Sequence, residues 1–224
     1  MTRPRTVPML CVALVAAIVY AVMWVGCCQH WNWLQRCDWS LLDAARDLAV
    51  QHPVWVRFWD AVSLVLGPVP LRLAGLVAAV TALVMRNPRA ALVLVACAPL
   101  SGLVTLAAKA LVDRPRPETM LVVADSSSFP SGHALEVTAA TLALLAFLVP
   151  LMGRALGRAA IAVAALNVLS VGIARVSLNV HYPSDVLAGW SLGYLYFLLC
   201  LLVFRPGRPA GRAHAVTAQL PNRG

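Results

Sequence analysis

Long apolar runs, separated by short polar and basic stretches, dominate the pattern of this chain. A transmembrane helix needs about 20 apolar residues, with roughly 17 as a practical minimum. Six runs approach or exceed this length: 7–26, 69–85, 90–112, 133–153, 159–174 and 186–204. Arg72 lies near one end of the second run, from where its charge can reach the membrane surface. The pattern therefore predicts an all-α, polytopic membrane helical bundle of about six transmembrane helices.

The segment 29–60, between the first two runs, has a different pattern. It contains five of the seven Trp, and Trp is typical of the membrane–water interface. Its apolar residues share one helical face and its charged residues another: Leu41, Leu42, Ala45, Leu48 and Ala49 against Asp43, Arg46 and Asp47. We therefore expect one helix that lies flat on the membrane surface.

The composition supports a membrane protein and excludes a disordered chain. Hydrophobic residues make up 61% of the chain and charged residues 12%, about half of the ~25% charged residues in an ordinary soluble domain. The net charge of +9 does not indicate nucleic-acid binding, because the basic residues are spread between apolar segments. With the N-terminus inside, the inner side receives ten Arg and no acid, and the outer side receives all nine acidic residues. The positive-inside rule therefore predicts that both termini are cytoplasmic.

The chain is expected to form one membrane domain, residues 1–204, followed by a disordered tail. The first run is longer than the apolar core of a secretory signal and lacks a small-residue cleavage site, so we interpret it as an uncleaved span. The tail, 205–224, is rich in Pro, Gly and Arg. No Cys pair has the spacing of a zinc site, and no metal is expected. Whether Cys27, Cys28 and Cys37 form a disulfide is left open.

Residues suited to phosphate binding lie at the outer ends of three predicted spans. Lys109, Arg116 and Arg175 supply ammonium and guanidinium donors, which suit phosphoryl oxygens. Ser131 and Gly132 come directly before a predicted helix, whose free N–H groups form an anion-binding site. Ionisable residues at this depth are costly and indicate a functional site.

Two His and an Asp at the same outer face are candidates for catalysis. His181 stands four residues before Asp185, whose carboxylate can hold one ring nitrogen and leave the other free as a nucleophile. His133 remains as a general acid and then a general base. The other His are expected to be structural: His30, His52 and His214.

Three segments of the chain resemble the signature of the type 2 phosphatidic acid phosphatase superfamily, the membrane lipid phosphate phosphatases. Residues 109–117 match the pattern K-x6-R-P, and residues 130–133 match P-S-G-H in full. Residues 174–185 match S-R-x5-H-x3-D, except that Ala174 replaces the Ser. The resemblance covers roughly residues 90–204, and its three motifs occur in the family's order.

The resemblance implies a mechanism for these residues. His181 would attack phosphorus and form a phosphohistidine, oriented by Asp185, while His133 would protonate the leaving oxygen and then activate water. Lys109, Arg116, Arg175 and the Ser131–Gly132 backbone would hold the phosphoryl oxygens. No metal or cofactor is implied. Ala174 puts one auxiliary hydrogen bond in doubt. The role of Arg114 and Glu118 is left open: they either influence which lipid headgroup binds or are simply solvated.

We therefore predict a plasma-membrane enzyme whose active site faces the outside and whose partners are membrane lipids. An outward-facing site in an apolar bundle favours undecaprenyl (polyprenyl) diphosphate as the substrate. Phosphatidylglycerophosphate and phosphatidate are the alternatives that the family offers. A non-enzymatic lipid-binding or transport protein on the same fold is the alternative from another class. The oligomeric state is left open.

Overall fold

The computed structural model describes residues 6–204, which form helices and no strand. The elements follow in the order α1 (Thr6–Cys28), α2 (Asn32–Gln51), α3 (Pro53–Val65), α4 (Pro68–Val84), α5 (Pro88–Cys97), α6 (Ser101–Leu111), α7 (Gly132–Leu148), η1 (Val149–Leu151), α8 (Arg154–Ser177) and α9 (Pro183–Val203). The predicted tail, 205–224, lies outside the described residues.

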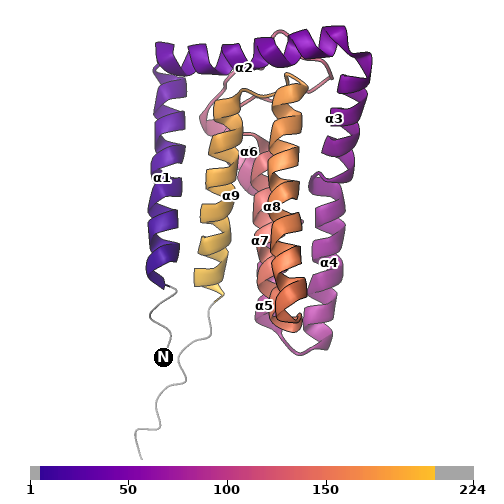
Figure 1. Ribbon diagram of the computed structural model, residues 1–224. Helices are drawn as coiled ribbons and strands as arrows, with labels where there is room; N and C mark the ends of the chain where they lie inside the picture. The colour runs from indigo at the N-terminus through magenta and orange to yellow at the C-terminus, as the bar shows by residue number, and fades with distance from the viewer. Residues whose placement is uncertain (1–5, 205–224) are drawn as a thin grey trace, which may run out of the picture.

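Six stretches of the described helices are long and apolar enough to cross a membrane, which confirms the predicted all-α bundle. They are α1, α3 with α4, α5 with α6, α7 with η1, α8, and α9. These helices stand side by side in Figure 1. Because the number of crossings is even, the first residues of α1 and the last of α9 lie at the same end (Figure 1).

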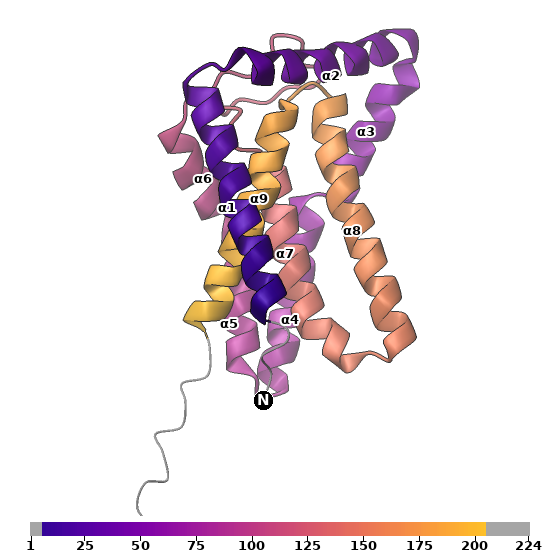
Figure 2. The ribbon, with the colours of Figure 1, turned by 60° about the vertical axis from the view of Figure 1, so that its left-hand side comes forward.

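Helix α2 lies across the other end of the bundle and confirms the predicted flat helix (Figures 1 and 2). It is a full 20 residues long. Its buried residues recur at helical spacing: Leu34, Asp38, Leu42, Ala45 and Ala49. Leu41 and Leu48, which we expected on the apolar face, are exposed. The buried stripe is therefore narrower than predicted, and it includes a carboxylate.

The second membrane passage is longer than predicted. It begins at Pro53 rather than at residue 69 and extends over 32 residues, so two Trp assigned to the surface segment belong to it. Pro68 divides this passage into α3 and α4, because proline lacks the N–H that would continue the helix. Pro99 separates α5 from α6 in the same way.

Helix α7 is the central helix of the bundle and packs against α4, α5, α6, α8 and α9. Its closest neighbour, α9, carries glycines at a four-residue spacing, Gly189 and Gly193, which face α7. A Cβ on these glycines would lie 2.6 Å from the carbonyl oxygen of Ser131 and 2.5 Å from that of Leu135. Their missing side chains allow the two backbones to approach closely, as small residues do in membrane helix pairs. This contact places the beginnings of α7 and α9 side by side.

Candidate active site

The predicted site residues lie at or near the ends of four helices, α6, α7, α8 and α9, or in the loop between α6 and α7. Lys109 is in the last turn of α6, and Arg175 is in the last turn of α8. His133 is in the first turn of α7, and Asp185 is in the first turn of α9. The N–H of Ser131 donates to the carbonyl oxygen of Asp185 at 3.0 Å, which joins the beginnings of α7 and α9 directly.

His181 lies two residues before α9 and is 2% exposed. Its own N–H donates to the carbonyl oxygen of Arg175 at 3.3 Å, which fixes it against the end of α8. Its Nδ1 lies 3.5 Å from Oδ2 of Asp185. The same oxygen accepts from the N–H of Tyr182 at 2.9 Å and from the hydroxyl of Ser128. Asp185 is therefore held in place by α9 and by the loop before α7.

The other ring nitrogen of His181 faces a guanidinium. Nη1 of Arg116 lies 3.3 Å from Nε2 of His181. A guanidinium can only donate, so this contact requires a lone pair on Nε2 and places the proton on Nδ1, toward Asp185. Burial lowers the pKa of His181 to about 4, with the charges of Arg175 and Arg116 acting in the same direction and Asp185 opposing them. At neutral pH the ring is uncharged, and Nε2 has the free lone pair that a nucleophile requires.

Lys109 and Arg116 are brought together by Ser126. Nζ of Lys109 donates to Oγ of Ser126 at 3.0 Å and also to the carbonyl oxygen of Ser127. Arg116 donates through Nε to the carbonyl oxygen of Ser126 at 2.6 Å and through Nη1 to that of Val180 at 2.5 Å. These contacts fix two cations beside His181 before any anion binds.

Arg175 is buried, with Nη1 donating to Oγ of Ser63 on α3 at 3.0 Å. Its Nε is buried without a hydrogen-bond partner among the described residues. An unpaired buried donor is costly. Arg175 therefore has the capacity to bind an anion in addition to its contact with Ser63.

The beginning of α7 has the geometry of an anion site. Ser131 is the N-cap, and its Oγ accepts from the N–H of Ala134 at 3.5 Å. Gly132 packs so closely on α6 that a Cβ there would lie 2.7 Å from Cγ2 of Thr105. Within residues 6–204, no hydrogen bond joins His133 to the other predicted site residues, although it lies at the same end of the bundle as they do.

Arg114, left open by the sequence, is a buried structural link. Its Nη1 donates to Oδ1 of Asp185 at 2.6 Å, and its Nη2 donates to Oδ2 of Asp38 on α2 at 2.8 Å. Ser184 donates to Asp38 through its N–H at 2.9 Å and through its hydroxyl at 2.6 Å. The guanidinium also stacks on Tyr182, 3.8 Å from the ring centroid. Burial lowers the pKa of Arg114, but Asp185 and Asp38 outweigh it and raise the pKa above its ordinary value.

Asp38, Ser63 and Ser128 belong to the site but were not predicted from the sequence. Asp38 had a detectable signal, because it lies four residues from Leu34 and from Leu42 on the same apolar face. Ser63 had none, since a Ser in an apolar stretch is ordinary, and Ser128 had none because it is one of three consecutive Ser in the loop before α7. Glu118 is exposed, which agrees with the simple solvated interpretation. The structure shows all six cysteines without a disulfide.

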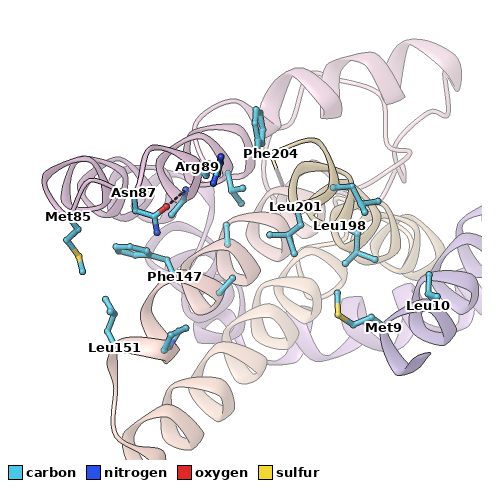
Figure 3. Close-up of a pocket in the computed structure, with 16 residues that line it drawn as sticks. Met9, Leu10, Met85, Asn87, Arg89, Phe147, Leu151, Leu198, Leu201 and Phe204 are labelled. Atoms are coloured by element: carbon cyan, nitrogen blue, oxygen red, sulfur yellow. Dashed lines mark hydrogen bonds between the residues drawn. The ribbon is translucent and has the colours of Figure 1, made fainter. Parts of the chain in front are cut away.

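A separate cavity of about 840 Å³ lies at the opposite end of the bundle from these residues (Figure 3). It is lined by apolar side chains of α1, α5, α7 and α9, with Asn87 just before α5 and Arg89 in the first turn of α5. None of the predicted site residues lines it. Among the described residues, no cluster of three or more His, Cys, Asp or Glu is placed to hold a metal ion.

Comparison with known proteins identifies the family of the chain. A family model described as the PAP2 superfamily matches residues 90–208. Phosphatidylglycerophosphatase B of Bacillus subtilis is 40% identical over 95 residues, which are 41% of this chain and 46% of that protein. Decaprenylphosphoryl-5-phosphoribose phosphatase of Mycobacterium tuberculosis is 39% identical over 90 residues, which are 38% of this chain and 45% of that protein. The matched stretches thus span about half the length of these curated relatives.

A solved structure has the same fold over most of the chain. It is the crystal structure of a transmembrane PAP2 type phosphatidylglycerolphosphate phosphatase from Bacillus subtilis, matched with a TM-score of 0.69. The match covers 87% of this chain and 94% of that one at 24% sequence identity. At this identity the likeness establishes the fold alone.

Proposed function

Because the chain belongs to the PAP2 superfamily, we propose that it removes a terminal phosphate from a membrane lipid through a phosphohistidine on His181. The observation that carries this proposal is the contact between Arg116 and Nε2 of His181, 3.3 Å apart. It leaves an uncharged imidazole whose free nitrogen faces the guanidinium of Arg116, which is where a phosphoryl group would bind.

In the proposed first step, Nε2 of His181 attacks phosphorus while the bond from phosphorus to the lipid oxygen breaks. The Nδ1 proton remains directed at Asp185, whose charge stabilises the imidazolium that forms. Lys109, Arg116 and Arg175 would bind the equatorial oxygens, where negative charge redistributes in the transition state. His133, at the beginning of α7, would give its proton to the leaving oxygen.

In the proposed second step, water attacks the phosphohistidine and the P–N bond breaks. His133, now neutral, takes the proton from water, and inorganic phosphate leaves. His181 returns to its uncharged form. Guanidinium, ammonium and backbone N–H groups carry the charge stabilisation throughout, so we expect no requirement for a divalent metal.

An apolar cavity among the membrane-spanning helices supports a lipid as substrate. It measures about 520 Å³ and lies between α3–α4, α7 and α8, a size at which proteins bind small ligands. Val65 and Leu66, two and three residues after Ser63, which binds Arg175, line this cavity. A hydrocarbon chain in this cavity would lie among the membrane-spanning helices, on the membrane side of the phosphate-binding residues.

Two substrates fit the proposal. Undecaprenyl diphosphate is the lipid that the sequence favours. Phosphatidylglycerophosphate is supported by the name of the Bacillus subtilis relative. The charge asymmetry of the chain supports cytoplasmic termini and an outward-facing site. A C-terminal tag that is accessible from outside intact cells would contradict this orientation.

The test is phosphate release by the purified protein in detergent, with a chelator present, on both lipids and on phosphatidate. We expect release that a chelator leaves unchanged and that His181→Ala abolishes. His52→Ala, at the exposed turn between α2 and α3 and outside the site, is the matched control and should keep full activity. Absence of release from every lipid would contradict the proposal and favour a lipid-binding or transport role.

A further inference from the structure

A second ionisable cluster lies inside the membrane-spanning part of the bundle. Arg72 of α4 forms an ion pair through Nη2 with Oε2 of Glu136 on α7. The hydroxyl of Thr105 on α6 donates to the other carboxylate oxygen at 3.2 Å. The sequence predicted that Arg72 extends to the membrane surface, and the structure shows it paired within the bundle instead. Ionisable groups at this depth are costly and indicate function.

The Arg72–Glu136 pair lies deeper in the membrane-spanning part than the phosphate-binding residues at the ends of α6 and α7. Oε1 of Glu136 lies 3.7 Å from the position of a Cβ on Gly132, at the anion-binding end of α7. Thr105 precedes Lys109 by about one helical turn on α6. Gly67, just before α4, would place a Cβ 3.6 Å from Cδ2 of His133. Helices α6 and α7, which meet α4 at Arg72, therefore also carry Lys109, Gly132 and His133 of the predicted site.

The guanidinium of Arg72 is only partly satisfied by Glu136. The ion pair uses Nη2, and Nε is buried without a hydrogen-bond partner among the described residues. The side chain nevertheless keeps 40% of its surface exposed. A guanidinium has five N–H donors in a fixed plane, so one carboxylate on one nitrogen leaves an edge that suits a phosphate.

We propose that Arg72 binds a second, inner phosphate of the lipid substrate, the one that links the terminal phosphate to the lipid. This inference rests on the proposed function. When the terminal phosphate is at His181, the remainder of the lipid extends toward the membrane, which is the side on which Arg72 lies. Undecaprenyl diphosphate and phosphatidylglycerophosphate both carry an inner phosphate, and phosphatidate does not. Arg72 thus selects lipids with two phosphates over those with one, and Glu136 holds it in position.

The test compares kcat/KM on these three lipids for wild type, Arg72→Gln and a matched control. The control is Arg57→Gln, an exposed arginine of the same membrane passage that lies outside the site. A charge-assisted hydrogen bond contributes about 1.5–3 kcal/mol, which corresponds to a factor of about 10 to 100. We expect the ratio of kcat/KM for each two-phosphate lipid to that for phosphatidate to fall by this factor in Arg72→Gln alone.

The double variant Arg72→Gln/Glu136→Gln separates binding from structure. Removing one partner leaves an unpaired buried charge, whereas removing both charges relieves it. We expect the double variant to recover thermal stability but not selectivity. An equal fall on all three lipids, or recovery of selectivity in the double variant, would overturn the proposal.

Binding measurements test the role of Arg72 separately from the proposed hydrolysis through His181. In a His181→Ala background, affinity for phosphatidylglycerophosphate and for phosphatidate is measured without turnover. Arg72→Gln should weaken binding of the first lipid selectively by a similar factor. If wild type hydrolyses none of the lipids, the proposed function fails. If it hydrolyses them and the binding ratio does not change, only the role of Arg72 fails.

Discussion

Asp38 offers the sharpest test of how the surface helix supports the site. Its carboxylate lies 2.8 Å from Nη2 of Arg114 and accepts two hydrogen bonds from Ser184. Arg114 in turn holds Asp185 at 2.6 Å. Asp38→Asn preserves the size of the side chain but removes its charge and places an amide donor near a guanidinium donor.

The expected magnitude follows from burial. The side chains of Asp38 and Arg114 are 2% and 13% exposed, so solvent screens their interaction little. Removing one partner of a buried pair costs about 3–5 kcal/mol, and we expect the lower end because Asn keeps an acceptor for Ser184. A loss of about 3 kcal/mol corresponds to a fall of about 6–12 °C in Tm for a chain of this size.

Catalysis should be affected as well as stability. In Asp38→Asn, Nη2 of Arg114 loses its carboxylate partner, so Arg114 holds Asp185 less firmly against His181. We expect kcat to fall about tenfold, which is a rise of about 1.4 kcal/mol in the barrier. Thermal unfolding in detergent and phosphate release measure the two effects. Asp43→Asn, an exposed Asp on the same helix, is the control and should change neither.

A double-mutant cycle with Arg114→Gln would refute the reasoning most directly. If Asp38 acts through Arg114, the two substitutions are strongly non-additive, as contacting residues are. A coupling energy below about 0.5 kcal/mol, with a Tm equal to that of Asp43→Asn, would show that the link does not stabilise the site.

Two further predictions follow, one from the site and one from the apolar cavity between α3–α4, α7 and α8. Since the pKa of His181 is lowered to about 4, its neutral form is lost only as pH falls through about 4. The part of the kcat/KM profile due to His181 should therefore rise with pH near 4. The substrate's own ionisation is followed separately by phosphorus NMR. A fall in kcat/KM below about pH 6.5 that this ionisation does not explain would contradict the prediction. Ala164→Phe should obstruct the 520 Å³ cavity, which Ala164 lines, whereas its exposed neighbour Ala165→Phe should not. In Ala164→Phe, the ratio of kcat/KM for long-chain to short-chain lipid phosphates should fall about fivefold or more, because each displaced CH2 costs about 0.8 kcal/mol. Equal ratios in the two variants would show that the hydrocarbon chain of the lipid does not bind in this cavity.

The membrane passages were predictable where apolar runs are long and uninterrupted. The second passage was not, because α3 contains Arg57 and Asp60 and two Trp, a composition typical of a surface segment. Its depth is decided by tertiary contacts: α3 packs on α8, and Ser63 binds Arg175. A local pattern cannot report such a partner 112 residues away.

The same distinction separates the predicted site residues from those that were missed. Motif spacing within one helix turn or loop identified His181 and Asp185, since both lie at the beginning of α9. The environment of Arg114 depended instead on Asp38, 76 residues earlier in the chain. Whether an arginine beside a motif is solvated or buried is determined by which distant helix covers it.

Three residues that support the site lie outside the segment that defines the family. The family model matches residues 90–208, whereas Asp38, Ser63 and Arg72 all precede residue 90. These three contact Arg114, Arg175 and Glu136 respectively, so each joins the N-terminal part of the chain to the catalytic segment. The motifs account for the reaction at phosphorus, and the N-terminal helices supply the additional charges around it. If substrate choice is determined by those charges, substitutions at Arg72 should change which lipid is hydrolysed, while substitutions at His181 should abolish hydrolysis of every lipid.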